Sequence, residues 1–317
     1  LVVVAIRPVW RLHLRFRPAL RFPPGVARRA GGLAIVGVVE LVAGDLSSVV
    51  AIALANGRGA TGAIVIYNYG FQAFSSLHAV LAIAVATSAF PLLAAREGPA
   101  FDRTCAQSTR AVMLVSWLAV AILAAIAVPA ADVLAHQHDQ IPQLTLGFAM
   151  FAPGLAGAGI VANLSRVLLA LGRLRVAAIA VAGSWLIATA ADVILTEFAP
   201  ARLVVAALAL GNTIGQVVVA VPLVLVVRRI RGRAAIQGTA HAALAGLAAA
   251  AAAAAAGVAI GLALPASHKL VATGVAALAA SVAVIVFGVV LYLLDDGDLR
   301  AGLARLRQGA LARFMTR

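Results

Sequence analysis

Residues 270–294 read LVATGVAALAASVAVIVFGVVLYLL, a stretch without a single charged side chain. The hydrocarbon core of a bilayer is about 30 Å thick, so a helix needs roughly 20 mainly apolar residues to cross it. This stretch is therefore long enough to cross a membrane as one helix. Seven similar runs precede it, and we predict eight membrane spans, at about residues 32–56, 63–95, 111–134, 144–171, 176–195, 203–227, 240–264 and 270–294.

The composition of the whole chain agrees with this prediction. The chain is 63% hydrophobic and 11% charged, with a mean hydropathy of +1.05, whereas soluble domains are about half apolar and a quarter charged. A membrane β-barrel would need segments of about ten residues with alternating polarity, and these runs are continuously apolar. We therefore predict an all-α fold, a polytopic transmembrane helical bundle.

Basic residues fall on alternate sides of the predicted spans, which explains the formal charge of +14 without nucleic-acid binding. One side holds seven arginines before the first span and the groups Arg96, Arg103 and Arg110; Arg166, Arg173 and Arg175; Arg228, Arg229, Arg231 and Arg233; and five arginines after the eighth span. The other side holds only Arg58, Arg202 and Lys269. The positive-inside rule then predicts a multi-pass plasma-membrane protein with both ends in the cytoplasm.

The two ends of the chain carry separate expectations. Residues 1–6 are too short to span and run into an arginine-rich stretch without an initiator Met, so we expect the tail of an earlier helix in a longer protein. No secretory signal precedes the spans. Residues 299–317 interleave apolar residues with arginines, a pattern that fits either an amphipathic helix on anionic lipid or a solvated basic tail.

Three acidic residues fall at membrane depth, where ionisable groups are costly and commonly functional. Glu40 and Asp45 lie in the first span and Asp192 in the fifth. Five positions separate the first two, about 140° around a helix, so they face different directions. Asp45, with two serines after it and a glycine before it that suggests an irregular backbone, suits a hard cation or a proton. The alternatives are carboxyls that only hold helices together and, for Asp192, snorkelling or capping.

The outer half of the second span is unusually polar, which favours a cavity lining over a lipid-facing surface. With Glu40 we assign to this predicted substrate cavity Tyr67, Tyr69, Gln72, Ser76 and His78. His78 alone also fits a neutral, hydrogen-bonded histidine. In the sixth span, Asn212 and Thr213 form a polar pair whose simplest role is hydrogen bonding between helices.

Other features predict structure rather than chemistry. Cys105 is the only cysteine, and we expect an ordinary loop thiol. The outer-loop pair His136 and His138 lacks further ligands, so we predict no metal site there. No nucleotide-binding or hydrolase motif occurs, and we predict no enzyme activity. The glycines of FAPGLAGAGI, residues 151–160, favour a bend and close helix approach.

Three segments resemble the MurJ (MviN) lipid II flippase family of the multidrug/oligosaccharidyl-lipid/polysaccharide exporter superfamily, particularly its actinobacterial members. They are ANGRGATGAIVIYNYGFQAFSSLHAVLAIAVATSAFPLLAAR, FAPGLAGAGIVANLSRVLLALGRLRVAA and LVVAALALGNTIGQ, which look like the family's eighth, tenth and twelfth helices. The resemblance implies a carboxy-terminal exporter lobe of the MATE-like type plus two extra helices. The eight spans would then be helices seven to fourteen.

This resemblance also implies a domain division and a partner. Residues 1–31 would be a cytoplasmic basic segment, 32–229 the six-helix carboxy-terminal transporter lobe, 230–294 the two additional helices and 295–317 a cytoplasmic basic tail. The partner lobe, with helices one to six, would lie outside the sequence in hand. The implied activity is alternating-access transport of lipid II, a polyprenyl-pyrophosphate-linked glycan of the membrane, for cell-wall synthesis.

The family's sodium site, carried over residue by residue, implies a coupling site at Asp45, Asp192, Leu208 and Asn212. Sodium is the only cofactor the resemblance implies. The family's last two helices form a groove for the polyprenyl tail, here at residues 240–264 and 270–294. One departure stands out, because Phe71 and Gln72 occupy the positions of an Asp-Arg pair whose arginine faces the lipid pyrophosphate in the family.

Two other functions remain open from the sequence. The lost Asp-Arg pair suggests a non-transporting paralogue that acts as a membrane scaffold for cell-wall proteins. The superfamily also includes exporters of other polyprenyl-linked glycans and of drugs. Arginines facing the cavity in the preceding sequence would favour transport, and their absence would favour the scaffold.

Overall fold

The computed structural model describes residues 26–265 and 268–294. The chain divides into two compact units, Leu1–Ile35 and Val36–Arg317, and every candidate site residue lies in the second. The predicted helix tail at residues 1–6 and the amphipathic tail at 299–317 fall outside the described residues. The helices of the described parts are α2 (Val26–Arg58), α3 (Ala63–Leu77), η1 (His78–Ile83), α4 (Ala84–Ala94), α5 (Gly98–Ala125), α6 (Ala127–Leu134), α7 (Gln140–Phe151), α8 (Gly154–Ala170), α9 (Leu174–Phe198), η2 (Ala201–Leu203), α10 (Val204–Arg231), η3 (Arg233–Ile236), α11 (Thr239–Ala263) and α12 (Lys269–Leu294).

Eight segments of the described chain are long and apolar enough to cross a membrane, as predicted. The described parts contain helices and turns but no strand. The spans are Ala34–Arg58, Ala63–Ala94, Gly98–Ala125, Gln140–Ala170, Leu174–Phe198, Ala201–Arg231, Arg233–Ala263 and Lys269–Leu294.

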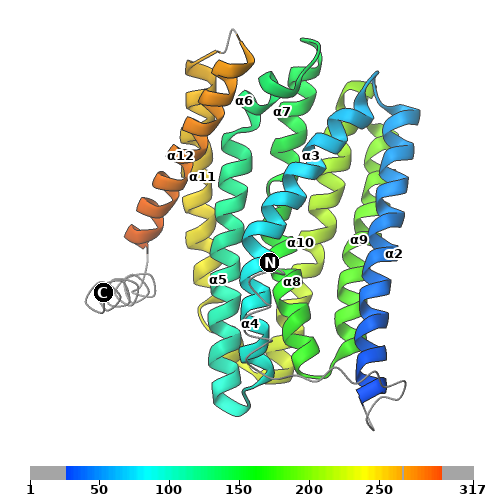
Figure 1. Ribbon diagram of the computed structural model, residues 1–317, viewed down its shortest axis with the longest axis vertical. Coiled ribbons are helices and arrows are strands. Elements are labelled where there is room, and N and C mark those ends of the chain that lie inside the picture. Colours follow the sequence, from blue (N-terminus) through cyan, green and yellow to red (C-terminus); the bar gives the residue numbers. More distant parts are fainter. Residues whose placement is uncertain (1–25, 266–267, 295–317) are drawn as a thin grey trace, which may run out of the picture. The chain divides into compact units, whose positions relative to one another are not determined.

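The helix α10 lies at the centre of the lobe and packs against α7, α8 and α9. The helix α8 also contacts α5, and α5 in turn packs against α11. The helix α12 continues this series by packing against α11 (Figure 1). The last two helices are therefore attached to the lobe mainly through α5.

The third span differs from its prediction. It begins at Gly98 rather than at residue 111, and α5 ends at Ala125, with α6 following as a separate short helix. Hydropathy located only the apolar part of α5, because the first four turns of this helix carry Asp102, Arg103 and Arg110. Cys105 therefore lies in a helix and is 0% exposed, so the expectation of a loop thiol was wrong.

The glycine-rich segment bends and packs as predicted. The helix α7 ends at Phe151, and α8 begins at Gly154 after a turn that contains Pro153. A Cβ at Gly157 would lie 2.7 Å from the backbone carbonyl carbon of Gln216, so only glycine lets α8 approach α10 this closely.

The second span contains a π-helical turn, η1, between α3 and α4. Single π-turns inside α-helices are uncommon and are frequent at functional sites. The span buries apolar residues all along this stretch, Phe74 before the turn, Ala82 within it and Ala86 after it.

The first span shows no irregularity at Gly44, contrary to the expectation from the sequence. The helix α2 is continuous from Val26 to Arg58. Gly44 instead lies where a Cβ would make ordinary contact, at 3.5 Å, with the Trp185 ring of α9. Ser48 donates a hydrogen bond to the Gly44 carbonyl at 3.0 Å, which satisfies its hydroxyl on its own helix.

Candidate functional site

The exposed face of α3 carries a polar stripe at membrane depth. Asn68, Gln72 and Ser76 recur one turn apart, and all three are exposed. Gln72 Nε2 donates to Ser76 Oγ at 3.3 Å. Amides facing hydrocarbon would be costly, because their remaining donors and acceptors would find no water. The stripe therefore faces water or another part of a protein. Of the cavity residues predicted on this span, Gln72 and Ser76 lie on it.

The aromatic residues of α3 turn toward the lobe instead. Tyr67 is 5% exposed, and Tyr69 is half-buried against the same core. The Phe71 ring is in contact with aromatic rings on three helices, at centroid distances of 5.9 Å to Tyr67, 6.2 Å to Phe151 and 6.5 Å to Trp185. The position that the resemblance aligns with an acid is thus filled by a ring that packs on the core.

His78 stands at the start of the π-turn. Its ring stacks on Phe74 with a centroid distance of 6.2 Å. Its buried Nδ1 atom has no hydrogen-bond partner among the described residues. Buried ring nitrogens are normally paired, so this atom is open to a water molecule or a ligand group.

Arg166 is the functional candidate that the sequence analysis missed. The sequence analysis counted it among the basic residues between two spans. In the structure it lies inside α8, where its Nη1 donates to the Ala162 carbonyl at 2.8 Å. Ala162 is one turn farther than Arg166 from the carboxy-terminal end of α8. The guanidinium therefore points back into the membrane-spanning part of the helix instead of snorkelling to the membrane surface near Ala170. Arg166 interacts electrostatically with Glu40 of α2 and with His78. The sequence did contain a sign of this position, because Asn163 and Arg166 are polar residues within an otherwise apolar run.

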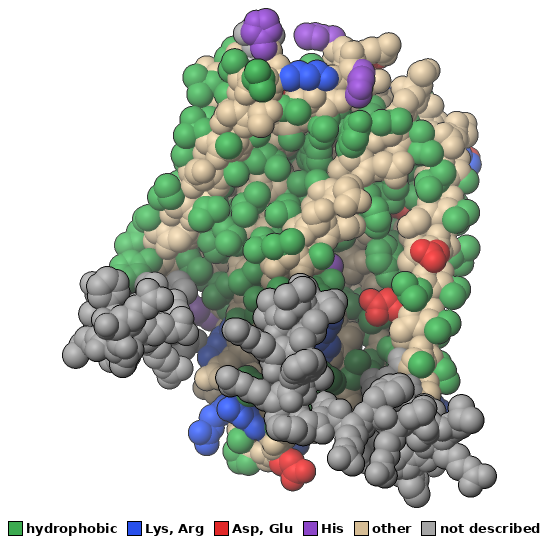
Figure 2. All heavy atoms as spheres, viewed as in Figure 1, with side chains coloured by type: hydrophobic (Ala, Val, Ile, Leu, Met, Phe, Trp, Pro, Cys, Tyr) green, Lys and Arg blue, Asp and Glu red, His purple; other side chains and the backbone are tan. Residues whose placement is uncertain are grey.

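The acids of α2 are both exposed. Glu40 and Asp45 lie among exposed apolar residues such as Leu41, at 67%, and Leu46, at 50%. Figure 2 shows acidic side chains in red on the otherwise apolar surface of α2. Charges in such surroundings need a partner or water.

Asp192 of α9 is 2% exposed, which excludes the alternative that it snorkels to water. It is packed so tightly against Gly211 of α10 that any Cβ there would collide with its carboxylate. Its Oδ1 atom and the Nδ2 atom of Asn212 are both buried without hydrogen-bond partners in the described chain. Tyr67 lies within electrostatic reach of Asp192, and Leu208 is fully buried. Asp192 Oδ1 and Asn212 Nδ2 are thus two unpartnered polar atoms near the α9–α10 contact, because Asn212 directly follows Gly211.

Asp45 does not join this spot. Two contacts show the register of α2 against α9: Gly44 lies at Trp185, and exposed Arg58 pairs with exposed Glu197 at 2.5 Å. In this register Asp192 is level with residue 52 of α2, seven residues or about 10 Å beyond Asp45. The structure therefore places the Asp192 carboxylate against Gly211 of α10, the residue before Asn212, with Leu208 buried one turn earlier on that helix, and it leaves Asp45 exposed on α2.

The histidines of the α6–α7 turn lie beside Asp132 and His268 at a shallow cavity of about 200 Å³. Burial raises the pKa of Asp132, and nearby His138 partly offsets this effect. Within residues 26–265 and 268–294, no group of three or more His, Cys, Asp or Glu side chains is placed to hold a metal ion.

Comparisons with known proteins match this chain to one family. A family model described as lipid II flippase MurJ matches residues 2–280. A solved structure, described as lipid II flippase MurJ in an inward closed conformation, is similar with a TM-score of 0.62 and 14% sequence identity. The match covers 84% of this chain and 53% of that one, so the chain spans about half the length of the flippase structure. Comparison with curated proteins found no match.

Proposed function

The chain belongs to the MurJ lipid II flippase family, and from this premise we propose that it is the carboxy-terminal part of a carrier that flips a polyprenyl-pyrophosphate-linked cell-wall precursor across the bacterial plasma membrane. The observation that carries the proposal is the exposed polar stripe of α3, residues 68, 72 and 76. An exporter lobe faces its partner lobe across a central cavity, and alternating access moves the substrate through that cavity. A partner lobe on the α2–α3 side would turn the stripe into cavity lining.

Arg166 supplies the cationic group of this lobe. Its planar guanidinium suits a phosphate oxygen pair better than a point charge does. Glu40 of α2 lies within electrostatic range of it, so an opposite charge is near when the cavity holds no substrate. The resemblance implies that an arginine at the position of Gln72, on α3, would contact the pyrophosphate. In this proposal Arg166 makes that contact instead, and it does so from α8.

Asp192 and Asn212 form the coupling site. A carboxylate and an amide oxygen are hard ligands that suit sodium, and an amide can turn either its oxygen or its nitrogen toward a neighbour. Both side chains have an unpartnered atom, which leaves ligand capacity at the α9–α10 contact. Asp45, about 10 Å away along α2, would join the site only after a movement of α2 along α9.

The test of the proposed function is complementation of a bacterium depleted of its own lipid II flippase. The gene is used in its natural context, and lipid II exposed at the cell surface is the readout. Rescue is the expected result. Failure by a well-expressed, membrane-inserted protein would contradict the flippase function and favour a scaffold.

Substitutions separate the two roles. Asp192→Asn is expected to lower lipid II export about tenfold, equivalent to ~1.4 kcal/mol of lost coupling, and to abolish its dependence on sodium. Arg166→Gln is expected to lower export at every sodium concentration. Glu197→Gln serves as the matched control, since it removes a carboxylate of α9 from an exposed ion pair with Arg58. Full export by the Asp192 variant would rule out the coupling site.

The scaffold function keeps one specific observation in its favour. Phe71 is built into an aromatic core cluster with Tyr67, Phe151 and Trp185, so this part of α3 is specialised for packing rather than for ion binding. A scaffold would tolerate Arg166→Gln without any phenotype in cell-wall assembly, whereas a flippase would not.

A further inference from the structure

The cavity between the α6–α7 turn and the start of α12 gathers titratable side chains that the proposed function does not use. Its volume is about 200 Å³, and its lining includes Asp132, His136, His138, His268 and Lys269. Three of the six histidines of the chain thus meet at one place. Figure 2 shows histidine side chains, in purple, at this end of the molecule. We call this space the histidine cavity.

The charge of the histidine cavity depends on pH. While the histidines are neutral, Asp132 and Lys269 are the charged residues of the lining, and their charges cancel. Imidazole ordinarily gains its proton between about pH 8 and pH 5. After protonation, four cations face the one carboxylate. Burial raises the pKa of Asp132, so acid also weakens this carboxylate. The other acid of the turn, Asp139, is exposed and lies outside the lining.

The helix α12 begins at this cavity, which makes added positive charge there costly. The Ala272 amide donates to the His268 carbonyl at 3.0 Å, so His268 holds the first position of the helix. Lys269 follows it, and the first turn contains no acidic residue. The amino terminus of a helix carries a partial positive charge and disfavours cations. A protonated His268 would therefore be repelled by Lys269, by the other two histidines and by its own helix.

The two walls of the histidine cavity are held with different strength. The α6–α7 turn is closed by its own hydrogen bonds, from the His136 amide to Gln140 Oε1 and from the Gln140 amide to the Gln137 carbonyl, both at 3.1 Å. The helix α12 packs on α6 and α11, with Ala272 and Val275 buried. Among the described residues, no hydrogen bond or ion pair joins the α6–α7 turn to the first turn of α12. Repulsion would therefore move the start of α12 rather than the turn.

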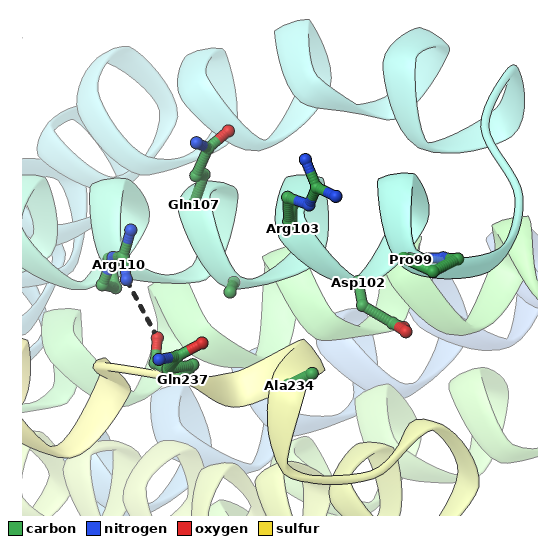
Figure 3. Close-up of a pocket in the computed structure, with 8 residues that line it drawn as sticks. Pro99, Asp102, Arg103, Gln107, Arg110, Ala234 and Gln237 are labelled. Carbon is green, nitrogen blue, oxygen red and sulfur yellow. Dashed lines mark hydrogen bonds between the residues drawn. The ribbon is translucent and has the colours of Figure 1, made fainter.

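The cavity at the opposite, basic end of the lobe is built differently (Figure 3). It has a volume of about 400 Å³ and lies between α5 and the connection from α10 to α11. Hydrogen bonds join its two sides, from Arg110 Nη1 to the Gln237 carbonyl at 3.1 Å and from Arg231 Nε to Asp102 Oδ1 at 2.8 Å. No histidine belongs to its lining in the described part of the chain. This end should therefore keep its structure where the histidine cavity changes charge.

We propose that the histidine cavity is a pH-sensitive contact, which keeps the start of α12 beside the α6–α7 turn at neutral pH and releases it when His136, His138 and His268 are protonated. The positive-inside rule predicts that this end lies outside the cytoplasm, where the pH follows the surroundings of the cell. The contact thereby lets the medium act on α12 without a change at the basic end of the lobe.

The experiment measures the position of the start of α12 at about pH 8 and about pH 5. The protein at its natural length, in neutral lipid and with its native cysteines replaced by alanine, carries spin labels at Leu270→Cys and Phe198→Cys, positions that are 87% and 84% exposed. Pulsed electron resonance gives the distribution of distances between the labels. The displaced population is expected to be about tenfold larger in acid, equivalent to ~1.4 kcal/mol of repulsion between like charges near the surface. Labels at Ala234→Cys and Phe198→Cys report on the basic end and should show no change.

Variants identify the groups responsible. The triple variant His136→Gln, His138→Gln and His268→Gln keeps polar side chains that cannot gain a proton, and it is expected to abolish the acid-induced change. His268→Gln alone should reduce the change. The matched control is His241→Gln, which removes an exposed histidine of α11 outside the cavity and should leave the change intact. An unmodified protein that does not respond to pH, a triple variant that still responds, a control variant that does not, or an equal response at Ala234 would overturn the proposal.

Discussion

The spans that contain α3 and α12 bury a similarly small share of their apolar windows, 17% and 22%, yet they expose different chemistry. The open face of α3 carries the amides of Asn68 and Gln72. The open face of α12 carries residues such as Leu270 and Ile285, at 87% and 63% exposure. Its exposed hydroxyls, Thr273 and Ser281, each donate to a carbonyl one turn back on α12.

The difference shows that low burial in a membrane protein has two meanings. A helix that satisfies every polar group on its own backbone can face lipid, because hydrocarbon offers no hydrogen bonds. A helix that exposes amides needs water or a protein partner. By this criterion α12 can border lipid and α3 borders water or another part of a protein, although hydropathy alone ranks both as ordinary spans.

The largest expected effect comes from placing the same charge on both faces. Ile285→Lys should cost ~2.5–3.5 kcal/mol of membrane insertion, because lysine near the middle of a lipid-facing helix has no partner. Gln72→Lys should cost almost nothing, since that face has access to water. The measurement is the fraction of each variant that integrates into membranes. Equal losses would break the distinction between α3 and α12.

A smaller effect is expected from glycines of the same two helices. Gly70 of α3 faces the lobe, and a Cβ there would lie 2.8 Å from the Phe151 ring, whereas a Cβ at Gly288 of α12 would meet nothing within 4 Å. Gly70→Val should lower stability by about 1–3 kcal/mol through overpacking. Gly288→Val should change it by less than about 0.5 kcal/mol. Thermal midpoints of the purified proteins compare them, and a neutral Gly70 variant would contradict the packing of α3.

The smallest effect on stability, and the most informative one for function, involves single polar groups. Gln72→Leu removes one exposed hydrogen bond to Ser76, and Ser281→Ala removes one to its own helix, so each should cost ~1 kcal/mol or less. Lipid II export should fall only in the Gln72 variant. An equal response of the two variants would mean that the α3 stripe does not line the transport path.

The sequence predicted the fold through its apolar runs, because eight uninterrupted segments leave a helical bundle as the only arrangement that satisfies the backbone in lipid. It placed the start of α5 too late, since the first turns of that helix carry Asp102 and Arg103 at the membrane edge and look like a loop by hydropathy. Cys105 was misplaced for the same reason.

The site was predicted less completely, because spacing along one helix says little about neighbouring helices. Asp192 and Asn212 lie 20 positions apart, and only the packing of the Asp192 carboxylate against Gly211 shows that it lies beside the residue before Asn212. Arg166 was assigned to a junction because a count of charges ignores the direction of a side chain. Tyr67 was expected in the cavity, but α3 turns it toward the core, which periodicity could not decide in a span that is apolar on several faces.

The π-helical turn at His78–Ile83 has a consequence for how the length of this span can change over evolution. Such a turn holds one residue more than an α-helix needs, and it absorbs that residue without rotating the helix on either side. Deletion of one residue within the turn would leave α3 and α4 facing their present neighbours. The same deletion within α3 or α4 would rotate everything beyond it by about 100°. Homologous chains should therefore gain or lose a residue of this span at the turn and nowhere else.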